Sequence, residues 1–135
     1  MISTELARAL RDSGLTWKPV AGDWFLIDRV EADEEVFILS DMTVEAHEFS
    51  TGTVLGFNGT TEWALDSVAL EEALWLPRED QLRGLLASAF VALTALEGFT
   101  VSARIDGVTE HFSADDAANA YARAYLRLLD SFDAE

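Results

Sequence analysis

The stretch "FTVSARIDGVTEHFSADDAANAYARAYLRLL", residues 99–129, decides the fold because it joins a β-hairpin to a helix. Asp106-Gly107 favours the positive-φ turn of a two-residue hairpin loop, and apolar residues alternate with polar ones before it. This turn pairs Ser102 with His111, so the histidine is expected on the polar face of the sheet. The opposite, apolar face then requires cover from another element.

A helix over residues 114–131 is expected to supply that cover. Its apolar and aromatic residues recur at helical spacing: Tyr121, Tyr125, Leu128, Leu129 and Phe132. Ser113 stands before this helix, where its hydroxyl can accept a hydrogen bond from the backbone N–H of Asp116 as an N-cap. Asp115 and Asp116 complement the positive end of the helix dipole. We therefore interpret the serine, histidine and aspartates of residues 110–116 as a strand end and a helix start, not as a nucleophilic active site.

Two further helices are expected outside this stretch. Residues 3–13 carry a capping serine or threonine and leucines on one face, and Gly14 terminates this helix. Residues 66–90 are expected to be helical with a break at Pro77, and the main helix runs over 78–88. Within this segment, residues 68–74 fit either a short helix or a strand.

Strands fill the region between these helices. The apolar runs at residues 23–30 and 35–42 are separated by acidic residues and predict an antiparallel pair. Asn58-Gly59 predicts a second tight hairpin, in which Leu55 pairs with Glu62 and Val54 pairs with Trp63. Hairpins combined with helices on one side of the sheet predict an α+β fold, arranged as a single domain over residues 1–135.

Most large aromatic residues are expected in the core of a chain of this length. This applies to the four tryptophans: Trp17, Trp24, Trp63 and Trp75. The acidic Glu110 falls on the apolar face of the hairpin, where it requires an arginine partner such as Arg123 or a place at the rim. The longest apolar runs are too short for a membrane span, no signal peptide is recognisable, and a cytoplasmic location is expected.

The net charge of −16 argues against binding of nucleic acid or of an anionic membrane through a basic surface. Residues 30–77 contain eleven acids and no lysine or arginine. One interpretation is a solvated acidic face in an acid-rich proteome, and the other is a docking surface for a basic partner. The candidate docking residues are the seven acids of the first half of this segment: Glu31, Asp33, Glu34, Glu35, Asp41, Glu45 and Glu48.

Catalytic and cofactor motifs are scarce in this sequence. The chain has no cysteine, which excludes disulfides, thiol catalysis and cysteine-bound metal sites. Glu45 and His47 would point the same way from a strand, and His111 is the other imidazole, but a metal site requires three or four ligands. A Gly-rich phosphate loop is absent and Lys18 is the only lysine, so we expect no cofactor.

Two resemblances accompany these patterns. The hairpin and helix of residues 99–130 resemble the end of HicB-type antitoxins, in which a capped, alanine-rich helix follows a strand. The motifs "WLPREDQLRGLL" and "FSADDAANAYARAYLRLL" resemble those of a set of small bacterial and phage proteins, a set that implies no activity or functional residues.

The sequence alone leaves three functions open. The leading hypothesis is a small acidic, non-enzymatic protein that binds a basic protein partner, such as a cationic toxin or nuclease. The first alternative is a small hydrolase or metal-dependent enzyme that uses His47, His111 and nearby carboxylates. The second is a structural subunit that self-associates through apolar sheet or helix faces, with a homo-oligomer of unspecified size.

Overall fold

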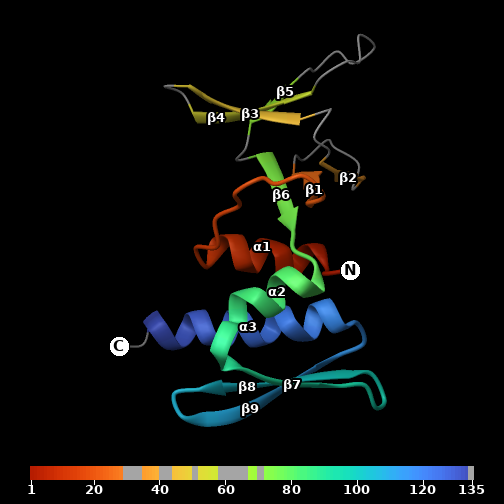
Figure 1. Ribbon diagram of the computed structural model, residues 1–135, viewed down its shortest axis with the longest axis vertical. Coiled ribbons are helices and arrows are strands. Elements are labelled where there is room, and N and C mark those ends of the chain that lie inside the picture. Colours follow the sequence, from red (N-terminus) through yellow and green to blue (C-terminus); the bar gives the residue numbers. More distant parts are fainter. Residues whose placement is uncertain (29–34, 40–43, 50–51, 58–66, 70–71, 134–135) are drawn as a thin grey trace. The chain divides into compact units, whose positions relative to one another are not determined.

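The computed structural model of the chain describes residues 1–28, 35–39, 44–49, 52–57, 67–69 and 72–133 (Figure 1). Contacts between Cα atoms divide the chain into two compact units. Unit 1 consists of Met1–Thr16 and Pro77–Glu135, and unit 2 is the segment Trp17–Leu76 between them. Helices and antiparallel sheets confirm the α+β class. The prediction of a single domain stays a prediction, and each unit is described separately.

Unit 1 begins with the helix α1 (Thr4–Asp12), as the sequence predicts. Ser3 is its N-cap, and the Ser3 hydroxyl accepts a hydrogen bond from the backbone N–H of Leu6 at 3.2 Å. The helix ends at Asp12 with Ser13 as C-cap, and Gly14 follows with a φ of +106°, which is accessible to glycine at little steric cost. The buried face of α1 contains Ala7 and Leu10.

The expected hairpin is confirmed together with its register. Strand β8 (Phe99–Ile105) pairs antiparallel with β9 (Val108–Ala114), and Ser102 lies opposite His111. Asp106 and Gly107 both have positive φ, as the tight turn requires. On the helix-facing side of β8, Val101, Ala103 and Ile105 are buried. Val108 lies opposite Ile105, but it is 63% exposed beside the turn.

A third strand, β7 (Phe90–Thr94), extends this hairpin into a sheet of order β7-β8-β9. The sequence pattern does not predict this strand. A register shift between Phe90 and Ala92 marks a bulge at its start, after which Ala92, Leu93 and Thr94 pair regularly with β8. Strand β7 is therefore an edge of the sheet.

The last helix, α3 (Ala117–Asp133), starts later than predicted, and its cap is Asp116 rather than Ser113. An Asp116 carboxylate oxygen accepts a hydrogen bond from the backbone N–H of Ala118 at 2.8 Å. Ser113 instead belongs to β9, where its hydroxyl pairs with the Thr100 hydroxyl at 2.9 Å. The strand thus continues past the serine, because its neighbour offers a cross-strand hydroxyl partner.

Helix α3 lies along β8 and β9, and helix α2 (Glu79–Leu86) packs against it (Figure 1). Helix α2 begins where the sequence predicts, with Arg78 as N-cap, and the short 3-10 turn η2 (Ala87–Ala89) follows it. The core between these elements contains Leu82 and Leu86 of α2 and Tyr121 of α3, all at most 3% exposed. Phe132 was also expected in the apolar stripe, but it is 62% exposed in the last turn of α3.

Unit 2 contains a sheet of order β2-β1-β6, which confirms the predicted antiparallel pair. Its strands are β1 (Trp24–Ile27), β2 (Val36–Ile38) and β6 (Ala73–Leu76). For residues 68–74 the sequence leaves a short helix and a strand open, and the described part of this segment is mainly strand. Residues 67–69 and 73–76 are strands, because the apolar run of β6 pairs with the distant β1, with Phe25 opposite Trp75.

An aromatic cluster forms the core beside this sheet. Trp17 and Phe25 are buried, with ring centroids 5.4 Å apart, and Phe37 lies 5.6 Å from Phe25. The expected core position is confirmed for Trp17, while Trp24 and Trp75 are partly buried. Trp63 lies outside the described residues.

The second sheet of unit 2 has the order β3-β4-β5, with strands β3 (Val44–Phe49), β4 (Gly52–Phe57) and β5 (Ser67–Ala69). The predicted register of Leu55 with Glu62 is wrong. Leu55 pairs with Ala46 of β3 on one side and with Val68 of β5 on the other. The strand that follows β4 and pairs with it therefore lies later in the sequence than predicted. Val54 likewise pairs with Ala69 rather than with Trp63. The predicted Asn58-Gly59 turn itself lies outside the described residues.

Candidate functional site

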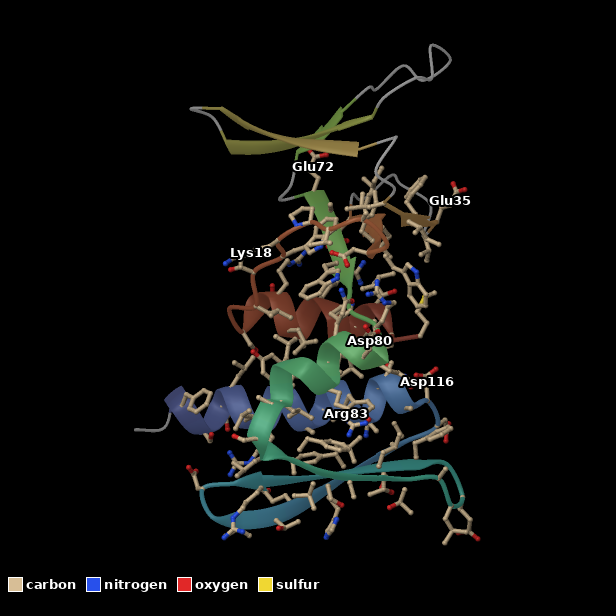
Figure 2. The ribbon with its side chains drawn as sticks, in the orientation of Figure 1. Lys18, Glu35, Glu72, Asp80, Arg83 and Asp116 are labelled. Carbon is tan, nitrogen blue, oxygen red and sulfur yellow. The ribbon has the colours of Figure 1, made fainter. Side chains whose placement is uncertain are left out.

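The predicted acidic surface falls in unit 2. Glu31, Asp33, Glu34 and Asp41 lie outside the described residues, and Glu45 and Glu48 belong to strand β3. Glu35 is described: it directly precedes β2, and its side chain is exposed at the edge of the sheet (Figure 2). Of the seven candidate acids, Glu35 is therefore the one whose side-chain position the structure describes.

The division into units separates the charges of the chain. Unit 2, residues 17–76, contains thirteen acids against the two bases Lys18 and Arg29. Unit 1 contains twelve acids and seven bases. Unit 2 thus has a net charge of −11 and unit 1 a net charge of −5, although unit 1 is the longer of the two.

Strand β2 presents apolar side chains beside the acidic Glu35. Val36 is 37% exposed and Ile38 is 63% exposed. Phe37, between them, points to the other face of the strand and packs on the aromatic cluster. The exposed face of β2 therefore carries two aliphatic side chains, and the exposed carboxylate of Glu35 directly precedes the strand.

The two histidines lie on different sheets. His47 belongs to β3, opposite Val54 of β4. His111 belongs to β9 in unit 1 and is exposed. In the part of the chain that the structure describes, no group of three or more histidine, aspartate or glutamate side chains could hold a metal ion.

His111 and Ser102 form a close pair, with the ring Nδ1 2.7 Å from the serine Oγ. A nucleophilic triad contains a serine and a histidine at such a distance, together with a third group that orients the histidine ring. The described residues provide no carboxylate hydrogen-bonded to this ring, and Ser102 is only 9% exposed. The geometry therefore supports a cross-strand hydrogen bond that holds β8 to β9.

Glu110 obtains the arginine partner that its place on the apolar face requires, but the partner is not Arg123. The Nε atom of Arg127 lies 3.5 Å from a Glu110 carboxylate oxygen, one helical turn beyond the predicted arginine. Arg123 instead donates to the backbone oxygen of Ser113 at 3.2 Å. The change follows from the later start of α3.

An open depression of about 330 Å³ lies at the start of α3, and its lining comprises Glu97, Ser113, Ala114, Asp115 and Arg123. Arg123 is already hydrogen-bonded to the backbone there, and Glu97 and Asp115 face solvent. The depression provides two exposed carboxylates but no enclosed polar group, so it does not form a built ligand site.

The carboxylate of Asp116, the residue after Asp115, accepts a hydrogen bond from the Met1 ammonium at the start of α3 (Figure 2). Burial opposes ionisation of its carboxyl group, but the hydrogen bond from the Met1 ammonium, the backbone N–H of Ala118, the ammonium charge and the backbone N–H of Asn119 outweigh it. Together they lower the pKa of Asp116 below its ordinary value of 3.8. These contacts assign Asp116 to the structure of the helix start.

Sequence reasoning missed one buried carboxylate, Asp23. It is 2% exposed and accepts hydrogen bonds from the Trp17 indole Nε1 at 2.9 Å and from the backbone N–H of Val20 at 3.0 Å. The signal was a tryptophan and an aspartate on either side of a loop that contains Pro19 and Gly22. Asp23 closes this loop over the aromatic core, which is a structural role.

Every helix of the described chain is too short or too polar to cross a lipid bilayer. Comparison of the sequence with protein-family models and with curated proteins, and of the structure with solved structures, found no match.

Proposed function

We propose that this chain is a non-enzymatic interaction protein whose unit 2 binds a basic protein partner. The observation that carries the proposal is the concentration of charge in one compact unit, where thirteen acids accompany two bases. Like charges at this density repel one another, and a cationic partner relieves that repulsion. Unit 1, with a helix-covered sheet and the smaller net charge of −5, serves as the scaffold.

The exposed residues 35, 36 and 38, at and just before β2, indicate how the partner is held. Glu35 attracts a lysine or arginine, while Val36 and Ile38 offer aliphatic surface for the stem of that side chain or for an apolar neighbour. Electrostatic attraction of this kind acts mainly on the association rate and weakens as salt screens it. We place the protein in the cytoplasm, and the resemblance of residues 99–130 to HicB-type antitoxins favours a cationic toxin or nuclease as the partner.

Two matched variants test the proposal in co-purification from the native cell extract at low and high salt. Each removes four negative charges from the net charge of −16. The first changes the acidic segment: Glu31→Gln, Asp33→Asn, Glu34→Gln and Glu35→Gln. The second is a control in unit 1, at positions whose side chains are exposed: Glu5→Gln, Glu97→Gln, Asp106→Asn and Asp115→Asn.

The wild type and the control are expected to retain the same cationic partner at low salt and to lose it at high salt. The first variant should lose that partner at low salt as well. Equal recovery by both variants would show that the acidic segment is only a solvated face. Equal loss by both would show that the overall charge, and not unit 2, determines binding.

A further inference from the structure

The outer edge of β7 carries no charged residue, unlike the other long sheet edges among the described residues. The chain has two thirteen-residue stretches without a charged residue, 49–61 and 84–96. The first contains β4, which is the central strand of its sheet and needs no protection. The second ends in β7, which is an edge strand.

Natural edge strands usually carry charges or prolines that prevent pairing with another chain. The opposite edge of the same sheet follows this rule, because β9 includes Glu110 and His111. Strand β7 includes neither a charge nor a proline. The bulge between Phe90 and Ala92 interrupts the start of the strand, but residues 92–94 keep regular strand geometry and offer an edge for pairing.

The helix-facing side of β7 is also incompletely covered. Phe90 at the start of the strand stacks on Tyr121 of α3, with ring centroids 5.8 Å apart, and the Arg83 guanidinium lies 4.3 Å from the centre of the Phe90 ring. Beyond this point the cover ends. Leu93, which lies opposite Val101 on this side, is 39% exposed. Val91 in the bulge is 53% exposed, and Leu96, two residues beyond the strand, is 77% exposed, so apolar side chains remain open along this part of the chain.

We infer that this edge is the contact surface between two copies of the chain, which pair β7 against β7 in antiparallel orientation. The charge distribution selects this occupant. Two chains of net charge −16 repel each other, and their approach is least unfavourable along a stretch that carries no charge. A basic partner gains nothing from such a stretch, whereas a second copy contributes the same aliphatic side chains.

Antiparallel pairing of identical strands within one sheet requires a twofold axis perpendicular to the sheet. The product is a continuous six-stranded sheet with both α3 helices on the same face. The two copies of Leu93 then meet at the seam on that face, and the free backbone amides and carbonyls of β7 become paired. Because the seam is short, we expect a weak dimer with a small interface, and its population should increase with protein concentration.

The test is sedimentation equilibrium of the full chain over a range of concentrations at low and high salt. The wild type should shift from the mass of one chain toward that of two, and more so at high salt, which screens the repulsion. This salt dependence is opposite to that expected for binding of a basic partner, so the failure of either proposal can be recognised separately.

Two lysine variants with the same change of charge locate the seam. Leu93→Lys should remove the dimer at every concentration, because it places a charge in the seam. Val108→Lys alters a residue of β9 that is 63% exposed at the other edge of the same sheet, and it should leave the dimer unchanged. A dimer that survives Leu93→Lys, or that is lost equally in both variants, would overturn the assignment.

Hydrogen exchange of the wild type provides a measurement that does not depend on a variant. The backbone amides of residues 91–96 should exchange more slowly at high than at low protein concentration, while those of β9 should not change. A wild type that keeps the mass of one chain at all concentrations, or a concentration effect confined to other strands, would refute the inference.

Discussion

Replacement of Asp116 separates the two roles that the structure gives to this residue. Asp116→Ala removes both the cap of α3 and the negative charge beside the Met1 ammonium, which lies 2.6 Å from the carboxylate. Asp116→Asn removes the charge but keeps an oxygen that can cap the helix, because asparagine caps about as well as aspartate. Ser113→Ala, three residues earlier, serves as the control.

The expected magnitudes follow from these contacts. Loss of the cap costs about 1 kcal/mol of unfolding free energy. The charge interacts with the helix dipole and with an exposed ammonium, which together contribute about 0.5 kcal/mol after solvent screening. Asp116→Ala should therefore cost about 1.5 kcal/mol and Asp116→Asn about 0.5 kcal/mol. Ser113→Ala loses only an exposed hydroxyl pair and should cost at most about 0.5 kcal/mol.

Urea unfolding can be followed with two probes that report on different units. The three helices lie in unit 1 and all four tryptophans lie in unit 2. Far-ultraviolet circular dichroism should therefore record the loss caused by Asp116→Ala. Tryptophan fluorescence should show the same shift only if both units unfold together, which also tests the single-domain prediction. A larger loss for Ser113→Ala than for Asp116→Ala would refute the placement of the helix start.

The pH dependence of the same series has a definite sign. The pKa of Asp116 is lower in the folded protein, so its charge contributes stability above the ordinary value of 3.8. This contribution should disappear as the pH falls through the lower, folded-state pKa. The stability difference between wild type and Asp116→Asn should thus be constant near neutral pH and vanish in acid. A difference that increases in acid would contradict the direction of the shift.

Two further predictions concern side-chain and backbone contacts inside each unit. Asp23→Ala should destabilise unit 2 by about 2–4 kcal/mol in fluorescence-monitored unfolding, because it leaves the buried Trp17 indole N–H without its acceptor; a loss below about 1 kcal/mol would contradict this role. Gly98→Ala should destabilise the protein by about 1 kcal/mol or more, since φ is +98° and the new Cβ would lie 3.1 Å from a backbone oxygen. Gly84→Ala in α2 is the control: its new Cβ meets nothing within 4 Å, and it should stabilise the protein by up to about 1 kcal/mol. Thermal melts of these two glycine variants with shifts of the same sign would argue against the local geometry.

The features predicted correctly from the sequence are those that local chemistry determines. The Asp106-Gly107 turn determines the register of β8 and β9, so the pairing of Ser102 with His111 followed from counting residues. Ser3 caps α1 for the same local reason. Each of these outcomes depends on residues a few positions apart.

The features left open or predicted wrongly depend on contacts between distant residues. The segment that contains β6 has a composition that fits a helix, and it becomes a strand because β1 lies beside it, about fifty positions earlier in the chain. Similarly, Ser113 has the composition of a cap, but its hydroxyl pairs across the sheet with Thr100. The partner of Glu110 is Arg127 rather than Arg123, whose guanidinium donates to the backbone oxygen of Ser113 instead.

The candidate site was predictable only at the level of composition. The acidic bias of residues 30–77 is visible in the sequence, and the structure adds that the compact unit around it holds most of the net charge. The exposed Val36 and Ile38 beside Glu35 could not be expected from hydropathy alone, which places apolar residues in the core. The unprotected edge of β7 required the strand order.

The order in which a ribosome makes this chain has a consequence for its assembly. All described strand pairings of unit 2 join residues between 24 and 76, so none of them requires a residue that follows 76. Unit 1 depends on a contact across 116 positions, in which the backbone N–H of Ser3 donates to the side chain of Asn119 at 2.7 Å. Helix α1 must therefore wait for α3 during translation. For that interval the apolar face of α1 has no partner, and a nascent chain is most exposed to chaperones and to misassembly at this stage.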